Sequence, residues 1–161
     1  MSSSVNPIPE GFHTITAHIV VKDSRKAIEF YKKAFGAQDP HIAEGPDGGV
    51  MHATVKIGDS FLMLNDEFPD FHVLSPTSTK ADTCVRLNLY VPDADKVWKN
   101  ALDAGATVVM PLQDQFWGDR YGQVQDPFGH RWSIAQHIKD LTPEEMKKAQ
   151  DEAMASMPKH S

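Results

Sequence analysis

One pattern of residues occurs twice along the chain. Asp23 in the first copy corresponds to Asp93 in the second, and Gly36-Ala37 corresponds to Gly105-Ala106. In each copy an alternating apolar and polar segment, typical of a strand, precedes the Asp, and apolar residues at three- and four-residue spacing follow it. Since Asp favours the first position before a helix and Gly the position just after one, each copy predicts a strand followed by a helix.

Further strand-like segments follow each predicted helix. The first strands are expected over 14–22 and 84–91, and the later ones over 39–44, 49–57 and 60–65 in the first copy and 107–112, 120–126 and 130–137 in the second. Gly58-Asp59 and Asp126-Pro-Phe-Gly129 are turn sequences before the last strand of each copy. The sequence therefore predicts an α+β fold of two tandem βαβββ modules, in which a curved mixed sheet forms a cup.

The same pattern sets the expected domain organisation. We expect a flexible N-terminus over 1–11 and a single domain over 12–138, with module one at about 12–66, a linker at 67–82 and module two at 83–138. The linker is rich in Pro, Ser and Thr. Thr142-Pro-Glu-Glu145 is a capping box that opens a helix within 139–161, expected to end near Met154.

Composition excludes several kinds of partner. The formal net charge is -6 and the 16 Lys and Arg are scattered, so we expect neither nucleic acid nor membrane as a partner. No apolar run approaches the roughly 20 residues that a membrane-spanning helix needs. A single cysteine, Cys84, favours a reducing compartment, and we expect a cytoplasmic protein that binds a small molecule.

Three segments carry a resemblance to a known family. They are Ala27-Ile-Glu-Phe-Tyr-Lys-Lys-Ala-Phe-Gly36, Gly58-Asp-Ser-Phe-Leu-Met-Leu64 and Asp126-Pro-Phe-Gly-His-Arg-Trp132. With the paired modules, they resemble the vicinal oxygen chelate superfamily, and within it the PhnB-like, glyoxalase/bleomycin-resistance-like branch. The resemblance implies a homodimer. It covers lyases, dioxygenases, epimerases, thiol transferases and proteins that sequester an antibiotic, so it does not by itself name an activity.

The resemblance also implies four positions for metal ligands, on the first and last strand of each module. In this chain they fall at Thr16, at Leu62 or Met63, at Arg86 and at Ser133. None is a usual ligand of a divalent metal, and a guanidinium keeps its positive charge. We therefore expect no metal cofactor and judge metal-dependent glyoxalase I activity unlikely to be this chain's chemistry. The alternative is a rearranged metal site with His18, His52 and Glu67.

Strand alternation predicts which side chains line the cup. Arg86 suits an anionic oxygen, and aromatic side chains near Gly118 could stack on a flat ligand. Both features have a structural alternative. Arg86 could pair with an internal carboxylate, and an ion pair between Asp119 and Arg120 could hold the segment around Gly118 in place. The predicted ligand-binding residues are Thr16, His18, His52, Arg86, Asn88, Tyr90, Trp117, Arg120, Tyr121 and Ser133.

The sequence leaves three classes of function open. The leading one is the binding of a small organic molecule, aromatic or anionic, in a cup that lacks the usual metal ligands. The alternative is an enzyme: a lyase, an isomerase or a dioxygenase. A metal-independent enzyme would use His18 or Tyr90 as base and Arg86 as the partner of an oxyanion. A third possibility is a scaffold whose cup is filled by its own side chains.

Overall fold

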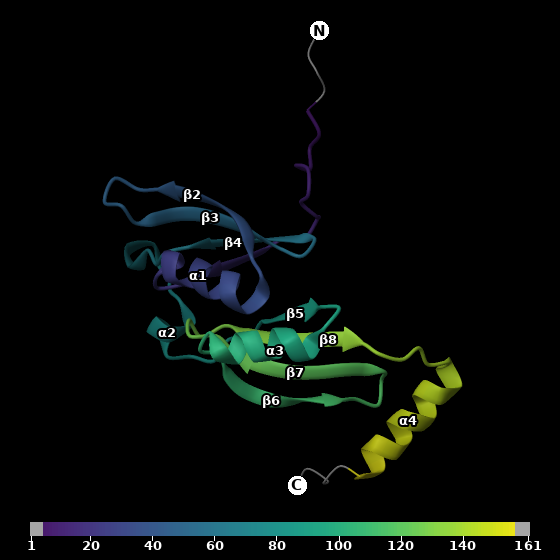
Figure 1. The fold of residues 1–161 in the computed structure, drawn as a ribbon. Coiled ribbons are helices and arrows are strands. Elements are labelled where there is room, and N and C mark those ends of the chain that lie inside the picture. The colour runs from purple at the N-terminus through teal and green to yellow at the C-terminus, as the bar shows by residue number, and fades with distance from the viewer. Residues whose placement is uncertain (1–4, 157–161) are drawn as a thin grey trace.

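A computed structural model describes residues 5–156 (Figure 1). Residues 1–4 of the N-terminus predicted to be flexible, and residues 157–161 of the predicted C-terminal tail, lie outside the described part. Module one consists of β1 (Ala17–Val20), α1 (Ser24–Phe35), β2 (Gln38–Glu44), β3 (Val50–Ile57) and β4 (Ser60–Asn65). Module two consists of β5 (Arg86–Tyr90), α3 (Ala94–Asp103), β6 (Thr107–Asp114), β7 (Asp119–Gln125) and β8 (Arg131–His137).

Each module forms its own four-stranded sheet. The strand order is β1-β4-β3-β2 in the first and β5-β8-β7-β6 in the second. The first strand of each module runs parallel to the last one, and the other neighbours are antiparallel. Figure 1 shows the two sheets one above the other, with α1 and α3 close together where the modules meet. The predicted tandem βαβββ fold is confirmed.

Both helices begin at their predicted caps, and α1 ends at its predicted glycine, whereas α3 ends one residue earlier than predicted, with Ala104 before Gly105. The Asp23 side chain accepts a hydrogen bond from the backbone N–H of Lys26, and Asp93 does the same for Lys96. Gly36 adopts the left-handed conformation, with φ of 67°, and its N–H donates to the carbonyl of Lys32. These contacts satisfy backbone groups that a helix leaves free at its ends.

The first strand is shorter than predicted. It begins at Ala17, where its pairing with Leu62 of β4 begins, and not at residue 14. Ile15, expected on the apolar face of this strand, is 90% exposed. Alternation of residue types continues beyond the point at which a neighbouring strand supplies hydrogen bonds, so the pattern overstated the length.

The two modules share one core. Tyr31 of α1 is fully buried and packs on Trp132 of β8, with 5.4 Å between ring centroids. Both rings donate hydrogen bonds to the same oxygen, Oδ2 of the buried Asp126, at 2.8 Å from the Tyr31 hydroxyl and 2.9 Å from Trp132 Nε1. Burial and the neighbouring carboxylate raise the pKa of Tyr31, so it remains a donor. A helix of module one thus holds the last turn of module two.

The connection between the modules contains two short helices, η1 (Pro69–Phe71) and α2 (Pro76–Thr79). After β8 the chain leads to α4 (Pro143–Ser156), whose start has the predicted capping box: Thr142 Oγ1 accepts from the N–H of Glu145, and the Glu145 carboxylate accepts from the N–H of Thr142. Within residues 5–156, no helix combines the length and apolar character that a membrane crossing requires.

Candidate functional site

Each sheet has one face that its helix does not cover, and on module two this open face is polar and aromatic. Alternation along β5 places Leu87 and Leu89 toward the core and leaves the residues between them on the other side. The β5–β8 and β7–β8 pairings extend the same face across the sheet. We call it the module-two face; its side chains are Arg86, Asn88, Tyr90, Asp119, Tyr121, Gln123, Arg131, Ser133 and Ala135, with Trp117 at its border.

A buried carboxylate organises one end of the module-two face. Asp119 is 4% exposed and accepts three hydrogen bonds from ring side chains: from the Tyr90 hydroxyl at 2.7 Å, from Trp117 Nε1 at 3.1 Å and from His137 Nδ1 at 2.9 Å. Burial tends to raise the pKa of Asp119, but these hydrogen bonds outweigh it and hold the pKa below its ordinary value. An ionised acceptor therefore fixes three rings, while Tyr90 stays 66% exposed.

A chain of hydrogen bonds fixes the middle of the module-two face. Gln123 Nε2 donates to the Tyr121 hydroxyl at 3.1 Å, and that hydroxyl lies 2.8 Å from the Ser133 Oγ. The Tyr121 ring also meets Trp117 edge to face, with centroids 5.5 Å apart. Ser133 is buried, so its hydroxyl is committed to the protein, whereas the rings of Tyr121 and Trp117 are only half-buried.

Arg120 does not belong to the module-two face, contrary to the prediction. It lies between Asp119 and Tyr121 on β7, so alternation turns its side chain to the opposite side. There its guanidinium donates to both carboxylate oxygens of Asp95, at 2.7 Å each, and to Asp114 at 2.9 Å. The predicted pairing of Asp119 with Arg120 is also wrong, because each has other partners. Arg120 joins α3 to the sheet.

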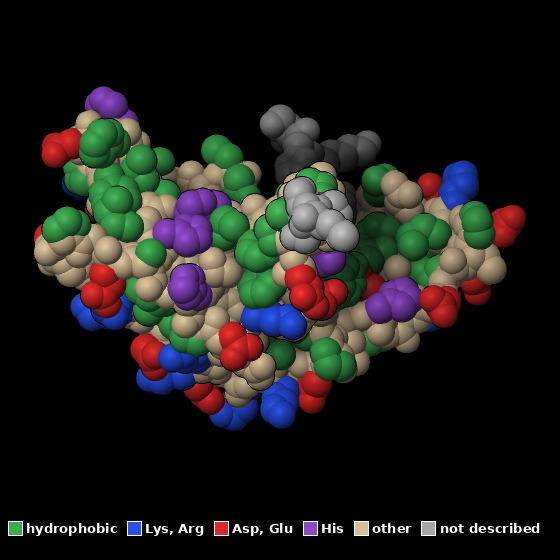
Figure 2. All heavy atoms as spheres, turned by 90° about the horizontal axis from the view of Figure 1, so that it is seen from above, with side chains coloured by type: hydrophobic (Ala, Val, Ile, Leu, Met, Phe, Trp, Pro, Cys, Tyr) green, Lys and Arg blue, Asp and Glu red, His purple; other side chains and the backbone are tan. Residues whose placement is uncertain are grey.

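The open face of module one carries a group of histidines, which Figure 2 shows in purple on the side seen from above. His18 Nε2 lies 2.7 Å from Asn65 Oδ1, and the rings of His18 and His52 meet edge to face with centroids 5.5 Å apart. Burial, followed by the nearby His18 and His41, lowers the pKa of His52. The sequence prediction placed His18 and His52 on one face, and the structure brings them together.

The rearranged metal set with Glu67 is contradicted by the contacts of that residue. The Glu67 carboxylate accepts from the backbone N–H of Ser75 at 2.7 Å and from the hydroxyls of Ser75 and Ser78. It therefore holds the start of α2. Within residues 5–156, no three His, Cys, Asp or Glu side chains lie close enough together to hold a metal ion.

The four metal-ligand positions that the resemblance implies do not fit a metal either. The β1–β4 register pairs His18 with Met63, which settles the position on β4 as Met63, since Leu62 is buried in the core. With Thr16, Arg86 and Ser133, the set offers a thioether, two hydroxyls and a guanidinium. It contains no carboxylate, imidazole or thiolate, which are the usual ligands of zinc and iron.

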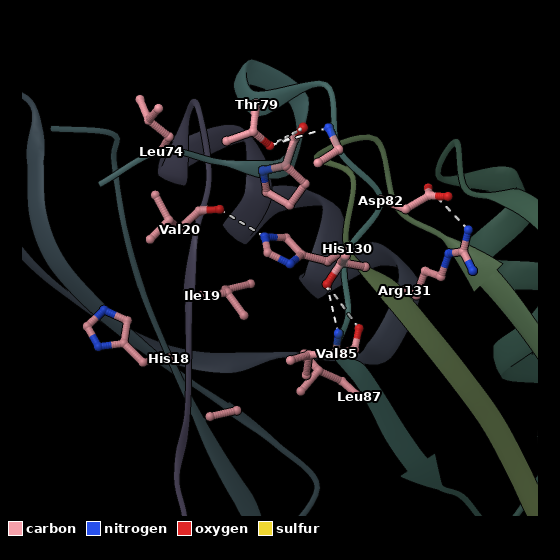
Figure 3. A pocket seen from close by; sticks show the side chains of 14 residues that line it. His18, Ile19, Val20, Leu74, Thr79, Asp82, Val85, Leu87, His130 and Arg131 are labelled. Carbon is pink, nitrogen blue, oxygen red and sulfur yellow. Dashed lines mark hydrogen bonds and ion pairs between the residues drawn. The ribbon is translucent and has the colours of Figure 1, made fainter. Parts of the chain in front are cut away.

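A cavity of about 370 Å³ lies where the first strands of the two modules approach each other (Figure 3). Its walls are mainly apolar, from β1, β5 and the connection that contains α2. His130 Nε2 lies 2.8 Å from the carbonyl oxygen of Val20, which closes one side. Arg131 lies at the border next to the module-two face, with its Nη2 3.2 Å from Asp82 Oδ1. The main apolar wall residues are Ala17, Ile19, Val20, Leu74, Val85 and Leu87.

Four residues of the candidate site were not predicted from the sequence as ligand-binding residues: Asp119, Gln123, Arg131 and His137. The available signal was the two-residue alternation: with β7 starting at Asp119, that residue, Tyr121 and Gln123 share a face. The prediction started the strand one residue later and treated Asp119 as part of a loop. His137 gave no local signal, because its partner Asp119 is 18 residues away in the sequence.

Comparisons with known proteins agree with this fold. The family model of the Glyoxalase/Bleomycin resistance protein/Dioxygenase superfamily matches residues 11–134. An uncharacterised protein of Mycobacterium tuberculosis is 44% identical over 138 residues, which cover 84% of this chain and 81% of that protein. The structure of TioX from Micromonospora is 26% identical, with a TM-score of 0.61 over 78% of this chain and 99% of that one.

A second solved structure is TnmS3, described as an antibiotic-binding protein from Streptomyces. It is 26% identical, with a TM-score of 0.55 over 78% of this chain and 95% of that one. Because the family model spans most of the chain, from the segment before β1 into β8, the assignment rests on both modules. The chain belongs to the Glyoxalase/Bleomycin resistance protein/Dioxygenase superfamily.

Proposed function

We propose that this protein binds a small organic molecule with a flat, aromatic part on the module-two face, without a bound metal. The observation that carries the proposal is the Asp119 carboxylate with its three ring donors, Tyr90, Trp117 and His137. A rigid aromatic surface loses little conformational entropy when a ligand stacks on it, so rings held in place favour binding. The half-exposed Tyr121 ring extends this surface.

Binding fits the chemistry of the face better than acid–base catalysis does. The hydrogen bond to Asp119, the largest influence, raises the pKa of Tyr90, so its hydroxyl would be a poor general base near neutral pH. His18, the other predicted base, lies on module one against Asn65. The likeness to TnmS3, an antibiotic-binding protein by its description, is consistent with a binding role.

We also propose that the binding unit is a homodimer. Among the described residues, no hydrogen bond or ion pair joins the histidine-bearing face of module one to the module-two face of the same chain. In a homodimer, module one of a second chain could cover the module-two face. Analytical ultracentrifugation tests this: a monomer at micromolar concentration, with or without ligand, would contradict the proposal.

A thermal-shift screen of aromatic compounds tests the binding proposal. Compounds that raise the melting temperature of the wild type should lose part of this effect in Tyr121→Ala, because the stacking surface is removed. Stacking on an aromatic side chain is worth about 0.5–1.5 kcal/mol, so we expect affinity to fall roughly two- to twelvefold. Trp98→Phe is the matched control, since Trp98 packs against the core away from this face. Equal loss in both variants, or none in Tyr121→Ala, would contradict the proposed site.

A further inference from the structure

Two arginines lie side by side at the end of the module-two face opposite Asp119. Arg86 of β5 and Arg131 of β8 are direct partners in the parallel register, so both side chains leave the same face of the sheet. Neighbouring strands are about 4.8 Å apart, so the two positively charged side chains start from adjacent backbone positions. Like charges directly opposite each other destabilise a sheet. The arrangement is therefore unfavourable for folding alone, in a chain whose net charge is -6.

The protein supplies little to neutralise this pair. Arg86 is exposed and takes part in no ion pair or side-chain hydrogen bond among the described residues. Arg131 has one acidic partner, Asp82, at 3.2 Å, and the Asp82 side chain is 77% exposed. The Arg131 Nε–H is buried and has no acceptor. A guanidinium has five N–H donors, so most of the donors of this pair remain free for a ligand.

The neighbours of the pair are neutral donors and acceptors. Asn88 and Ser133 lie next along the two strands, and Gln125 lies opposite Arg131 on β7. Gln125 is itself engaged, since its Nε2 donates to the carbonyl oxygen of Gly129 at 3.2 Å. Apart from Asp82, the nearest carboxylate on this face is Asp119, beyond Tyr121 and Gln123 along β7. Among the described residues, the carboxylate close to the pair is thus Asp82, and its ion pair with Arg131 offsets its charge.

We propose that Arg86 and Arg131 form a binding site for an anionic group of the ligand, a carboxylate or a comparable oxyanion. Planar guanidiniums bind such groups through paired, charge-assisted hydrogen bonds. The proposal rests on the proposed function, because the anionic group belongs to the molecule that stacks on the aromatic end. Tyr121 is opposite Ala135, four residues from Arg131 along β8, so the two ends are about 13 Å apart. The ligand is an elongated aromatic acid.

Arg131 also borders the cavity between the modules (Figure 3). An apolar substituent next to the anionic group could enter this cavity, where Val20 and Leu87 line the wall. The pair therefore recognises an acid with an apolar neighbouring part, and a fully hydrated ion such as sulfate should bind more weakly than an aromatic carboxylate. Removing apolar surface from water provides the difference.

The test compares two probes that carry the same naphthalene ring on a flexible chain, 6-(1-naphthyl)hexanoate and 6-(1-naphthyl)hexan-1-ol, and one probe without a ring, inorganic sulfate. The chain lets the polar group approach the arginines while the ring stacks on Tyr121. In Arg86→Gln, the affinity for the hexanoate should fall about tenfold, since one charge-assisted contact is lost, and the affinity for the alcohol should be unchanged. Arg131→Gln should behave alike. Arg25→Gln is the control and should change neither affinity, because Arg25 of α1 forms an exposed ion pair with Glu44 of β2. Calorimetry gives the affinities, and amide shifts in NMR spectra locate the probes.

Sulfate separates this inference from the proposed function. If sulfate moves the amide signals of Arg86 and Arg131 and the double Gln variant abolishes the effect, the anion site stands even where neither naphthalene compound binds. If the alcohol binds and the Arg variants leave the binding of the hexanoate and of sulfate unaffected, the aromatic site stands and the anion site is overturned. A lower melting temperature in Arg86→Gln would also count against it, because a residue without a partner should not stabilise the fold.

Discussion

Replacing Asp126 by Asn should be far more damaging than its small change in shape suggests. Asp126 is buried and accepts four hydrogen bonds: two on Oδ2, from Tyr31 and Trp132, and two on Oδ1, from the backbone N–H groups of Phe128 and His130. An amide that keeps its oxygen toward the backbone must place its NH₂ group against Tyr31 and Trp132. The Tyr31 hydroxyl can turn and accept. The Trp132 N–H is only a donor, and it would be left buried without a partner.

The magnitude follows from these contacts. Hydrogen bonds to a charged group contribute about 1.5–3 kcal/mol, and a buried donor without a partner costs about 1–3 kcal/mol. We expect Asp126→Asn to lower the free energy of unfolding by about 3 kcal/mol. Tyr31→Phe removes one hydrogen bond and leaves no donor unpaired, so it should cost about 1.5 kcal/mol. For a chain of this size, each kcal/mol lowers the melting temperature by about 2–4 °C.

Urea unfolding followed by circular dichroism measures both variants, at one fixed protein concentration because subunit association would contribute to the apparent stability. Asp59→Asn, in the exposed turn before the last strand of module one, is the control and should stay within about 0.5 kcal/mol of the wild type. The reasoning is refuted if Asp126→Asn resembles this control, or if Tyr31→Phe costs as much as Asp126→Asn.

Three further outcomes are expected. His137 lies between Asp140 and Asp119, and its hydrogen bonds to them, Asp140 first, raise its pKa; the stability it contributes is present below the ordinary histidine pKa and is lost as pH rises through the raised value. An NMR titration of the histidine ring protons should give a higher pKa for His137 in the wild type than in Asp140→Asn. Equal His137 pKa values in the two proteins would contradict the role of Asp140. Gly122→Ala should cost about 3 kcal/mol or more, because its Cβ would lie 2.7 Å from the Trp98 ring and 2.8 Å from the Leu112 Cα. Gly58→Ala, in open space with φ of 60°, should cost about 1 kcal/mol, and equal costs in urea unfolding would refute this difference. Calorimetric titration of dialysed protein with nickel, zinc, iron(II) and manganese should give no tight stoichiometric binding, and a tight site that His18→Ala or His52→Ala removes would restore the metal-dependent alternative.

The order of elements could be predicted from the sequence because local residues determine it. Asp23 and Asp93 cap the backbone a few residues ahead of them, and Gly36 ends its helix by its own conformation. The paired modules follow from the repetition of these signals. The ends of the strands were predicted less accurately, because pairing with a neighbouring strand determines them. For example, β1 begins at Ala17, where its pairing with β4 begins.

The organisation of the candidate site could not be predicted in the same way. Glu67 was assigned to a metal set, but it caps α2, through contacts with a segment that gives no warning in its own composition. Arg120 was predicted to bind an anionic group because its segment was expected to be a loop that borders the cup. It lies within β7, where adjacent residues point to opposite faces. Arg131 gained importance only through its register with Arg86. Each of these depends on a partner that is distant along the chain.

The contact between Tyr31 and Asp126 gives the two repeats different roles. In each repeat, the residue eight positions after the helix cap is buried. It is Tyr31 in module one and Ala101 in module two, and Ala101 has no hydroxyl that could donate a hydrogen bond. In the corresponding turn of module one, Asp59 is exposed, and among residues 5–156 its side chain hydrogen-bonds only to Ser60. The repeats have therefore become complementary parts, as in a duplicated unit that has diverged into two that need each other. Two halves separated within 67–82 would recognise each other, and two copies of the same half would lack the means to do so.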